Sequence, residues 1–133
     1  AAAPIRWIVE DAAKFVKREI RRGNRYEVVI LDPPSYGHGP HGQVWRLAKH
    51  LQRLIEWCGL LTDPQRRLML LSCHTPGFSP QRLRELVAEA LGENGRITAE
   101  PLVLRTADGR QLPSGAAVRW EGPARPNGRV DPV

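Results

Sequence analysis

Several features are scarce in this sequence, and each scarcity excludes a class of protein. The two cysteines, Cys58 and Cys73, are too few for a disulfide-stapled fold, so a reduced, cytoplasmic setting is expected. The longest apolar runs, such as residues 28–31 and 68–71, fall far short of the ~18 residues that cross a bilayer. No charged-then-apolar leader opens the sequence. We therefore expect neither a membrane protein nor a secretory precursor.

Lysine and methionine are also rare. The sequence has 3 lysines and 17 arginines, and its net charge is +6. A positive surface favours nucleic acid as a partner, although many ordinary enzymes carry such a charge for solubility.

The length of 133 residues fits one domain. The only methionine, Met69, lies in mid-chain, and we therefore expect the sequence to be a piece of a longer protein.

Alternating strand and helix patterns predict an open α/β sheet with helices on both faces. The expected strands are residues 5–9, 28–31 and 68–71, and an antiparallel pair, residues 97–104 and 116–120, is expected to close the sheet around a turn at 108–109. The expected helices are residues 12–22, 43–61 and 80–91. Asp11 and Ser79 are placed to cap the first and third helices.

Polar side chains follow three of the predicted strands, at the end where open α/β sheets bind their ligands. They are Glu10 and Asp11, then residues 32–36, then residues 72–74. In the second group, Asp32 precedes two prolines that hold the backbone extended. Its carboxylate can accept a hydrogen bond from an amino group, and Tyr36 can stack on a planar base. The alternative for this group is a rigid surface turn.

The sequence Asp-Pro-Pro-Ser-Tyr at 32–36, after a hydrophobic strand, resembles motif IV of class I S-adenosylmethionine-dependent methyltransferases. In particular, the chain is similar to bacterial 23S ribosomal RNA methyltransferases. Members of that group continue with a Gly-rich stretch and a Val-Trp-x-Leu helix, here residues 37–47, and later with a Gly-Phe-Ser-Pro turn, here residues 77–80. The likeness extends over residues 4–121.

The resemblance implies the cofactor S-adenosylmethionine and a role for several residues. Asp11 falls at the acidic position that meets the exocyclic amine of adenine, a donor for which a carboxylate is the natural acceptor. Asp32 would contribute to the cofactor site, and with Pro33 and Pro34 it would line the pocket where the methyl group meets its acceptor. Ser35 and Tyr36 would lie beside that pocket.

Cys73 falls where some RNA cytosine methyltransferases of this type keep a nucleophile. A thiolate there would add to the pyrimidine ring and activate a carbon for methylation. If the acceptor is an exocyclic nitrogen, positioning by Tyr36 and the Asp-Pro-Pro backbone is sufficient. Cys73 would then be a small buried residue, as Cys58 on a helix stripe is expected to be.

The same resemblance leads us to expect an N-terminally truncated Rossmann-like sheet. The first two strands and the Gly-rich cofactor loop of the family have no counterpart, so residues 1–121 would be the C-terminal part of a catalytic domain. Residues 122–133 would be a flexible tail. We expect the fragment alone to be inactive, and we expect its exposed strand edges to favour self-association.

Two further patterns have plainer interpretations. Residues 37–42 match G-x-G-x-x-G, but five residues separate them from the preceding strand, so a loop over the active site is favoured over a dinucleotide site. The four histidines fit no closed ligand set, and no metal site is predicted. Basic residues line the outer faces of the first two predicted helices. These faces are either a surface that contacts RNA or simply solvated helix faces. The residues are Lys14, Lys17, Arg18, Arg21, Arg22, Arg25, Arg46, Lys49, His50 and Arg53.

The sequence is therefore compatible with two functions. The first is an S-adenosylmethionine-dependent methyltransferase that acts on a base of RNA, ribosomal RNA included. The second is a non-catalytic basic α/β module that binds RNA or a protein and lacks the cofactor half.

Overall fold

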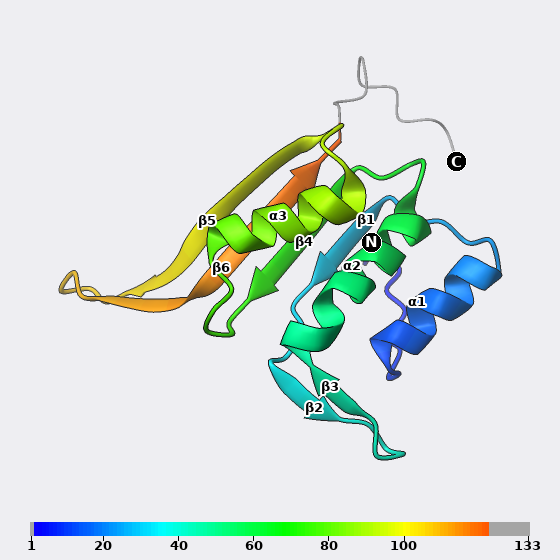
Figure 1. Cartoon of the computed structure of the whole chain (residues 1–133), viewed down its shortest axis with the longest axis horizontal. Coiled ribbons are helices and arrows are strands. Elements are labelled where there is room, and N and C mark those ends of the chain that lie inside the picture. Colours follow the sequence, from blue (N-terminus) through cyan, green and yellow to red (C-terminus); the bar gives the residue numbers. More distant parts are fainter. Residues whose placement is uncertain (1, 123–133) are drawn as a thin grey trace.

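The computed structural model describes residues 2–122 (Figure 1). The helices are α1 (Ala12–Arg21), α2 (Leu47–Thr62) and α3 (Pro80–Leu91). The strands are β1 (Val28–Leu31), β2 (Tyr36–His38), β3 (Val44–Arg46), β4 (Leu68–Cys73), β5 (Arg96–Arg105) and β6 (Gln111–Glu121). The tail expected at 122–133 lies outside the described residues, apart from Gly122.

One mixed sheet carries the architecture, with strand order β1-β4-β6-β5. β1 runs parallel to β4, so that Val28 lies opposite Leu68 and Leu31 opposite Leu71. β6 is antiparallel to both β4 and β5. The parallel pair confirms the predicted α/β class, and the β5–β6 hairpin confirms the predicted closing pair.

Capping residues set the helix ends close to where the sequence predicts them. α1 begins after Asp11, whose carboxylate accepts the backbone N–H of Lys14 at 2.9 Å. α3 begins after Ser79, whose hydroxyl accepts the N–H of Arg82 at 3.2 Å, and ends at Gly92 with φ 77°. Each cap satisfies a backbone donor that the helix itself leaves unpaired. Within residues 2–122, no helix has the length and apolar character of a membrane span.

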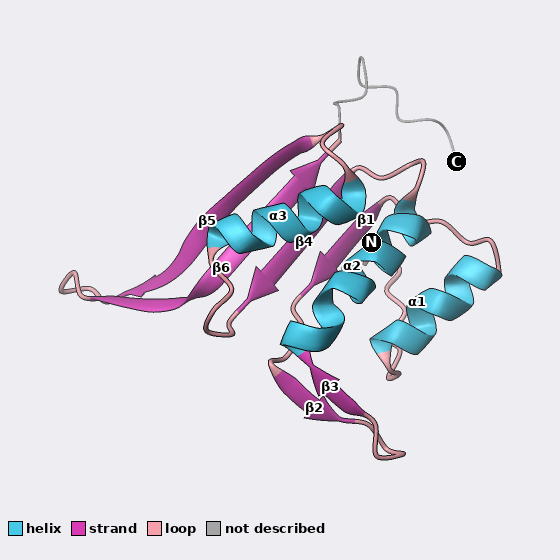
Figure 2. Ribbon diagram, viewed as in Figure 1, coloured by secondary structure: helices cyan, strands magenta, loops and turns pink. Residues whose placement is uncertain are grey.

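The three helices gather on one face of the four-stranded sheet, so the expectation of helices on both faces is wrong for the described residues (Figure 2). Along β4, Met69, Leu71 and Cys73 point into the core that α2 and α3 cover. On the opposite face, Val28 and Ile30 of β1 are 45% and 67% exposed. The β1–α2–β4 connection places α2 on one side of the sheet, and α1 and α3 both pack against α2.

Residues 5–9 do not form the strand that their apolar composition predicts. Trp7 is 87% exposed, and Val9 is fully exposed. A strand exists only through hydrogen bonds to a neighbouring strand, and no strand among residues 2–122 pairs with this segment. Propensity alone therefore does not order it.

A small hairpin replaces the first turn of the second predicted helix. β2 pairs antiparallel with β3, and α2 begins at Leu47 rather than near Gln43. Val44 and Trp45 favour extended backbone, and the indole N–H of Trp45 donates to the Pro34 carbonyl at 2.7 Å. The G-x-G-x-x-G segment is thus the tip of a hairpin and not the turn between a parallel strand and its helix.

Candidate active site

A cleft of about 380 Å³ opens beyond the C-terminal end of β1. The structure brings two of the predicted carboxylates, Asp11 and Asp32, to this one cleft, together with Pro33 and Pro34. Its remaining walls come from Ala12, Ala13, Ile30, Leu31, Trp45 and Leu54. Two acids in mostly apolar walls are able to orient a flat, amino-bearing ring.

Asp11 reaches the cleft because it is the residue at which the extended N-terminal segment turns into α1. Its Oδ1 accepts the Lys14 N–H. A carboxylate has more than one lone pair to offer, so the capping bond leaves Asp11 able to accept from a ligand as well. The side chain therefore serves the helix and the cleft together.

Asp32 is fixed by the strand next to its own. Because β1 and β4 are parallel and in register, Asp32 and Ser72 lie side by side one step beyond the Leu31–Leu71 pair. The Ser72 hydroxyl donates to Asp32 Oδ1 at 2.6 Å. His74 brings Nε2 to 3.3 Å from the same oxygen. Ser72 thus holds one oxygen of this carboxylate by a hydrogen bond, and the ring of His74 lies beside the same oxygen.

His74 is itself anchored to β6. Its Nδ1 lies 2.6 Å from the carbonyl oxygen of Ser114. A carbonyl oxygen only accepts, so Nδ1 carries the hydrogen of this bond. β6 comes this close because Gly115 has no side chain: a Cβ at that position would collide with the carbonyl of Cys73. The polar trio at residues 72–74 was visible in the sequence, but the anchoring of His74 was not.

Ser35 and Tyr36 lie near the cleft without lining it. The Ser35 hydroxyl lies 2.5 Å from that of Thr75, which ties the residue after Pro34 to the loop after β4. Tyr36 opens β2, is 51% exposed, and brings its hydroxyl to 3.0 Å from Nε2 of His38. The structure therefore places Tyr36 at the base of the hairpin that stands beside the cleft.

Both cysteines are completely buried among the residues that the structure describes. Alternation along β4 turns the Cys73 thiol toward the helices, whereas Ser72 points toward Asp32. Burial raises the pKa of the Cys58 thiol to about 12. Cys58 has the core-packing position expected for it, and Cys73 lies in the core and not in the cleft wall.

Trp45 is a cleft residue that we did not single out from the sequence. Its indole N–H donates to the Pro34 carbonyl, and its ring stacks on that of His50 at 5.3 Å between centroids. The Val-Trp-x-Leu pattern after the Gly-rich stretch is the signal that could have identified it. A tryptophan that holds the second proline of the motif contributes to the shape of the cleft.

Comparison with protein-family models and with curated proteins yields no match. Among solved structures, a SAM-dependent methyltransferase from Agrobacterium tumefaciens superposes with a TM-score of 0.80 and 37% sequence identity. The match covers 89% of this chain and 40% of that one. A protein from Streptococcus mutans, described as a candidate SAM-dependent methyltransferase, superposes with a TM-score of 0.61 at 16% identity. That match covers 85% of this chain and 30% of the other.

A third neighbour, SMU.776, was solved in complex with SAH and is described as a candidate methyltransferase. It superposes with a TM-score of 0.62 at 17% identity over 84% of this chain and 30% of that one. At such identities the last two neighbours show the fold alone. The chain spans less than half the length of each of these three neighbours. The chain therefore has the mixed α/β, Rossmann-like fold of part of a class I S-adenosylmethionine-dependent methyltransferase, and the Agrobacterium tumefaciens neighbour supports membership of that superfamily.

Proposed function

We propose that this chain is part of the catalytic domain of an S-adenosylmethionine-dependent methyltransferase that acts on a base of RNA. The observation that carries the proposal is the convergence of Asp11 and Asp32 on one apolar-walled cleft at the end of β1. The neighbours support the methyltransferase class. The choice of RNA, and of ribosomal RNA in particular, rests on the resemblance of residues 32–47 and 77–80 to the ribosomal RNA group and on the +6 charge.

The residues of the cleft fit the adenine end of S-adenosylmethionine. Ala12, Leu31 and Leu54 offer apolar surface to a flat ring. The carboxylate of Asp11 offers an acceptor to the exocyclic amine of adenine. When bound, S-adenosylmethionine supplies an electrophilic methyl group on a sulfonium centre.

Asp32 is the residue we assign to the methyl acceptor. Ser72 donates to Oδ1 and the ring of His74 lies against it, so the carboxylate is held in one orientation at the mouth of the cleft. A fixed carboxylate accepts a hydrogen bond from an amino group and so orients the acceptor atom of a base. Orientation of this kind supplies much of the barrier lowering in a transfer between two bound groups.

The burial of Cys73 supports an amino nitrogen as the acceptor. A nucleophilic thiolate has to reach the pyrimidine ring, and the Cys73 thiol is fully buried on the core side of β4. The alternative is methylation of a cytosine carbon through Cys73. The neighbours do not favour a third option, a non-catalytic RNA- or protein-binding module.

Isothermal titration of the intact protein with S-adenosylhomocysteine tests the cofactor assignment. Asp11→Asn keeps a side chain that caps helices well but removes the charge, so we expect it to weaken binding by roughly 1.5–3 kcal/mol. Ser79→Ala, which removes a cap from α3 far along the chain, is the control and should leave the affinity unchanged. If neither S-adenosylmethionine nor S-adenosylhomocysteine binds the wild-type protein, the proposal fails.

Methyl transfer by the Cys73→Ala variant of the intact protein separates the two chemistries. We expect the variant to keep its activity toward RNA, measured as incorporation of labelled methyl groups, because an amino acceptor needs no thiolate. Cys58→Ala, equally buried, controls for the cost of a cavity in the core. Activity lost in Cys73→Ala but kept in Cys58→Ala would instead establish carbon methylation.

A further inference from the structure

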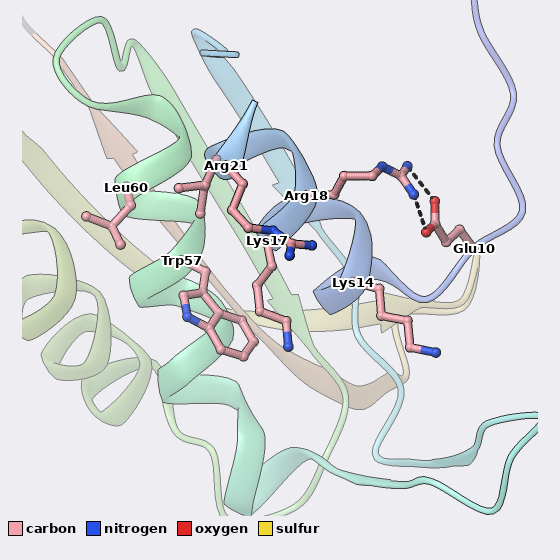
Figure 3. Close-up of a pocket in the computed structure, with 8 residues that line it drawn as sticks. Glu10, Lys14, Lys17, Arg18, Arg21, Trp57 and Leu60 are labelled. Carbon is pink, nitrogen blue, oxygen red and sulfur yellow. Dashed lines mark hydrogen bonds and ion pairs between the residues drawn. The ribbon is translucent and has the colours of Figure 1, made fainter. Parts of the chain in front are cut away.

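A line of connected hollows leads from the cleft along the groove between α1 and α2. A hollow of about 200 Å³ shares Asp11, Ala13 and Trp45 with the cleft wall and extends to Trp57. A larger one, of about 620 Å³, begins at Trp57 and continues between the two helices (Figure 3). We call this surface the α1–α2 track and define it by Lys14, Lys17, Arg21, Trp45, Arg53 and Trp57.

Three of the four cations of the track have no carboxylate partner among the described residues, whereas the fourth, Arg53, pairs with Glu56 at 3.3 Å. Among the described residues, Glu10 is the only acid in the wall of the larger hollow, and Arg18 binds both of its oxygens at 2.6 and 2.7 Å. Lys14, Lys17 and Arg21 form no ion pair with a carboxylate of residues 2–122. Their uncompensated charge calls for an anionic partner.

The three cations form a line. Lys14, Lys17 and Arg21 are three and four residues apart on α1 and so share one helix face, over a length of about 10 Å. Figure 3 shows Lys17 beside Trp57 of α2, with Lys14 on the same helix further from Trp57. A line of cations matches a repeating anion, such as a phosphate backbone, better than a single charge.

Indole rings lie between these cations and the cleft. The ammonium of Lys17 lies 4.7 Å from the ring centroid of Trp57, which is partly exposed. Leu60 beside it is 58% exposed. Trp45 is the second ring, at the end of the track where the cleft begins. Aromatic platforms interleaved with cations are how proteins bind single-stranded nucleic acid without reading its sequence.

We infer that the α1–α2 track binds the single-stranded RNA that flanks the methylated base. Phosphates lie along Lys14, Lys17 and Arg21, and a base stacks on the indole of Trp57 as the Lys17 ammonium moves from that ring to a phosphate. The strand then continues past Trp45 into the cleft. This inference rests on the proposed function for the identity of the strand. Stacking surfaces favour RNA over an acidic protein segment, which would use the cations but has no bases to stack.

Fluorescence anisotropy with a short labelled single-stranded oligoribonucleotide of mixed sequence tests the charges. Lys17→Ala/Arg21→Ala should raise the Kd about tenfold at low salt. The plot of the logarithm of the association constant against the logarithm of the salt concentration should become less steep by about 1.4, since each phosphate contact of a single strand contributes ~0.7 to the slope. Arg96→Ala/Arg105→Ala, on the exposed strand β5, removes the same charge and should change Kd little. Equal losses in the two variants would overturn the inference.

Trp57 distinguishes a nucleic-acid strand from any other polyanion. Trp57→Leu should weaken RNA binding about tenfold through the lost stacking, while Trp57→Phe retains most of it. Binding of inorganic polyphosphate, which has no bases, should be the same in both variants. If RNA and polyphosphate respond alike to Trp57→Leu, or if a polyglutamate peptide displaces RNA at equal concentration, the surface serves another anionic partner and the inference is wrong.

Calorimetry with S-adenosylhomocysteine on the intact wild-type protein separates this inference from the proposed function. If the cofactor binds and RNA binding is unaffected by the substitutions in the α1–α2 track, the inference is wrong and the proposed function still holds. RNA binding that depends on the track, without any cofactor binding, would support the docking surface and overturn the proposed function.

Discussion

Glu19 shows how one buried carboxylate joins α1 to the turn that follows it. Its side chain is only 6% exposed. It accepts from the Tyr26 hydroxyl at 2.7 Å and from the Asn24 amide at 2.8 Å, with Arg22 at 3.4 Å. The bond from Tyr26, followed by that from Asn24, holds the pKa of Glu19 below its usual value. These donors stabilise the ionised form.

The lowered pKa of Glu19 predicts how stability depends on pH. A carboxyl with a lower pKa in the folded state stabilises the fold above its unfolded pKa and loses that contribution as pH falls through the folded pKa. Glu19→Gln should therefore unfold more readily than wild type near neutral pH, and the difference should shrink below about pH 4. Urea unfolding followed by circular dichroism at several pH values measures this.

Glu56, on the exposed side of α2, offers a matched control for that experiment. It pairs with Arg53 at 3.3 Å, with the two side chains 40% and 67% exposed. Glu56→Gln should change little at any pH, because an exposed pair contributes little to stability. A difference between Glu19→Gln and wild type that stayed constant from neutral to acid pH would contradict the assignment.

At the scale of elements, the β2–β3 hairpin depends on two bonds to the Asp-Pro-Pro-Ser segment. Trp45 donates to the Pro34 carbonyl, and the backbone N–H of Leu47 donates to the Ser35 carbonyl at 3.1 Å. The second bond lies where the hairpin becomes α2. The first turn of α2 is thus coupled to the cleft wall.

Trp45→Phe removes the indole N–H and keeps an aromatic ring. We expect the free energy of unfolding to fall by about 1 kcal/mol, the usual net worth of one hydrogen bond. Hydrogen exchange at the Leu47 amide should also become faster, because the side chain at position 45 no longer holds the start of α2 against the Pro34 carbonyl. Trp7→Phe, at a side chain that is 87% exposed, is the control. Similar results for both variants would show that the hairpin does not depend on this bond.

At the scale of the whole molecule, the sheet is covered on one face and open on the other. β1 ends the strand order, and its outward side chains Val28 and Ile30 are exposed. An edge strand with apolar side chains tends to pair with or pack on another chain. The self-association expected from the sequence therefore stays a prediction, now located at β1.

Ile30→Lys should suppress that association. Sedimentation velocity of the wild-type chain should show a concentration-dependent shift to larger species, and the variant should lose the shift because a charge on the contact face opposes packing. Leu112→Lys, at a similarly exposed position on β6, is the control. Association that persists in Ile30→Lys would place the contact elsewhere.

Local chemistry explains how much of the fold the sequence predicts. α1, α3 and their caps at Asp11 and Ser79 follow from side chains that bond to backbone within three residues. β4 and the closing hairpin follow from apolar runs and a turn at Gly109. The Asp-Pro-Pro segment pointed to the cleft by itself, because the ends of parallel strands are where such sheets bind ligands.

Pairing between distant segments decided the rest. Residues 5–9 have the composition of a strand but no partner, whereas Val44–Arg46 has β2 as a partner and leaves the predicted helix. The register of β1 on β4 places Ser72 beside Asp32 and turns Cys73 into the core. The sequence by itself determined the elements and the polar residues at their ends. Only the tertiary structure decided which of those residues meet, because hydrogen bonds between strands and packing between helices depend on partners far away in the chain.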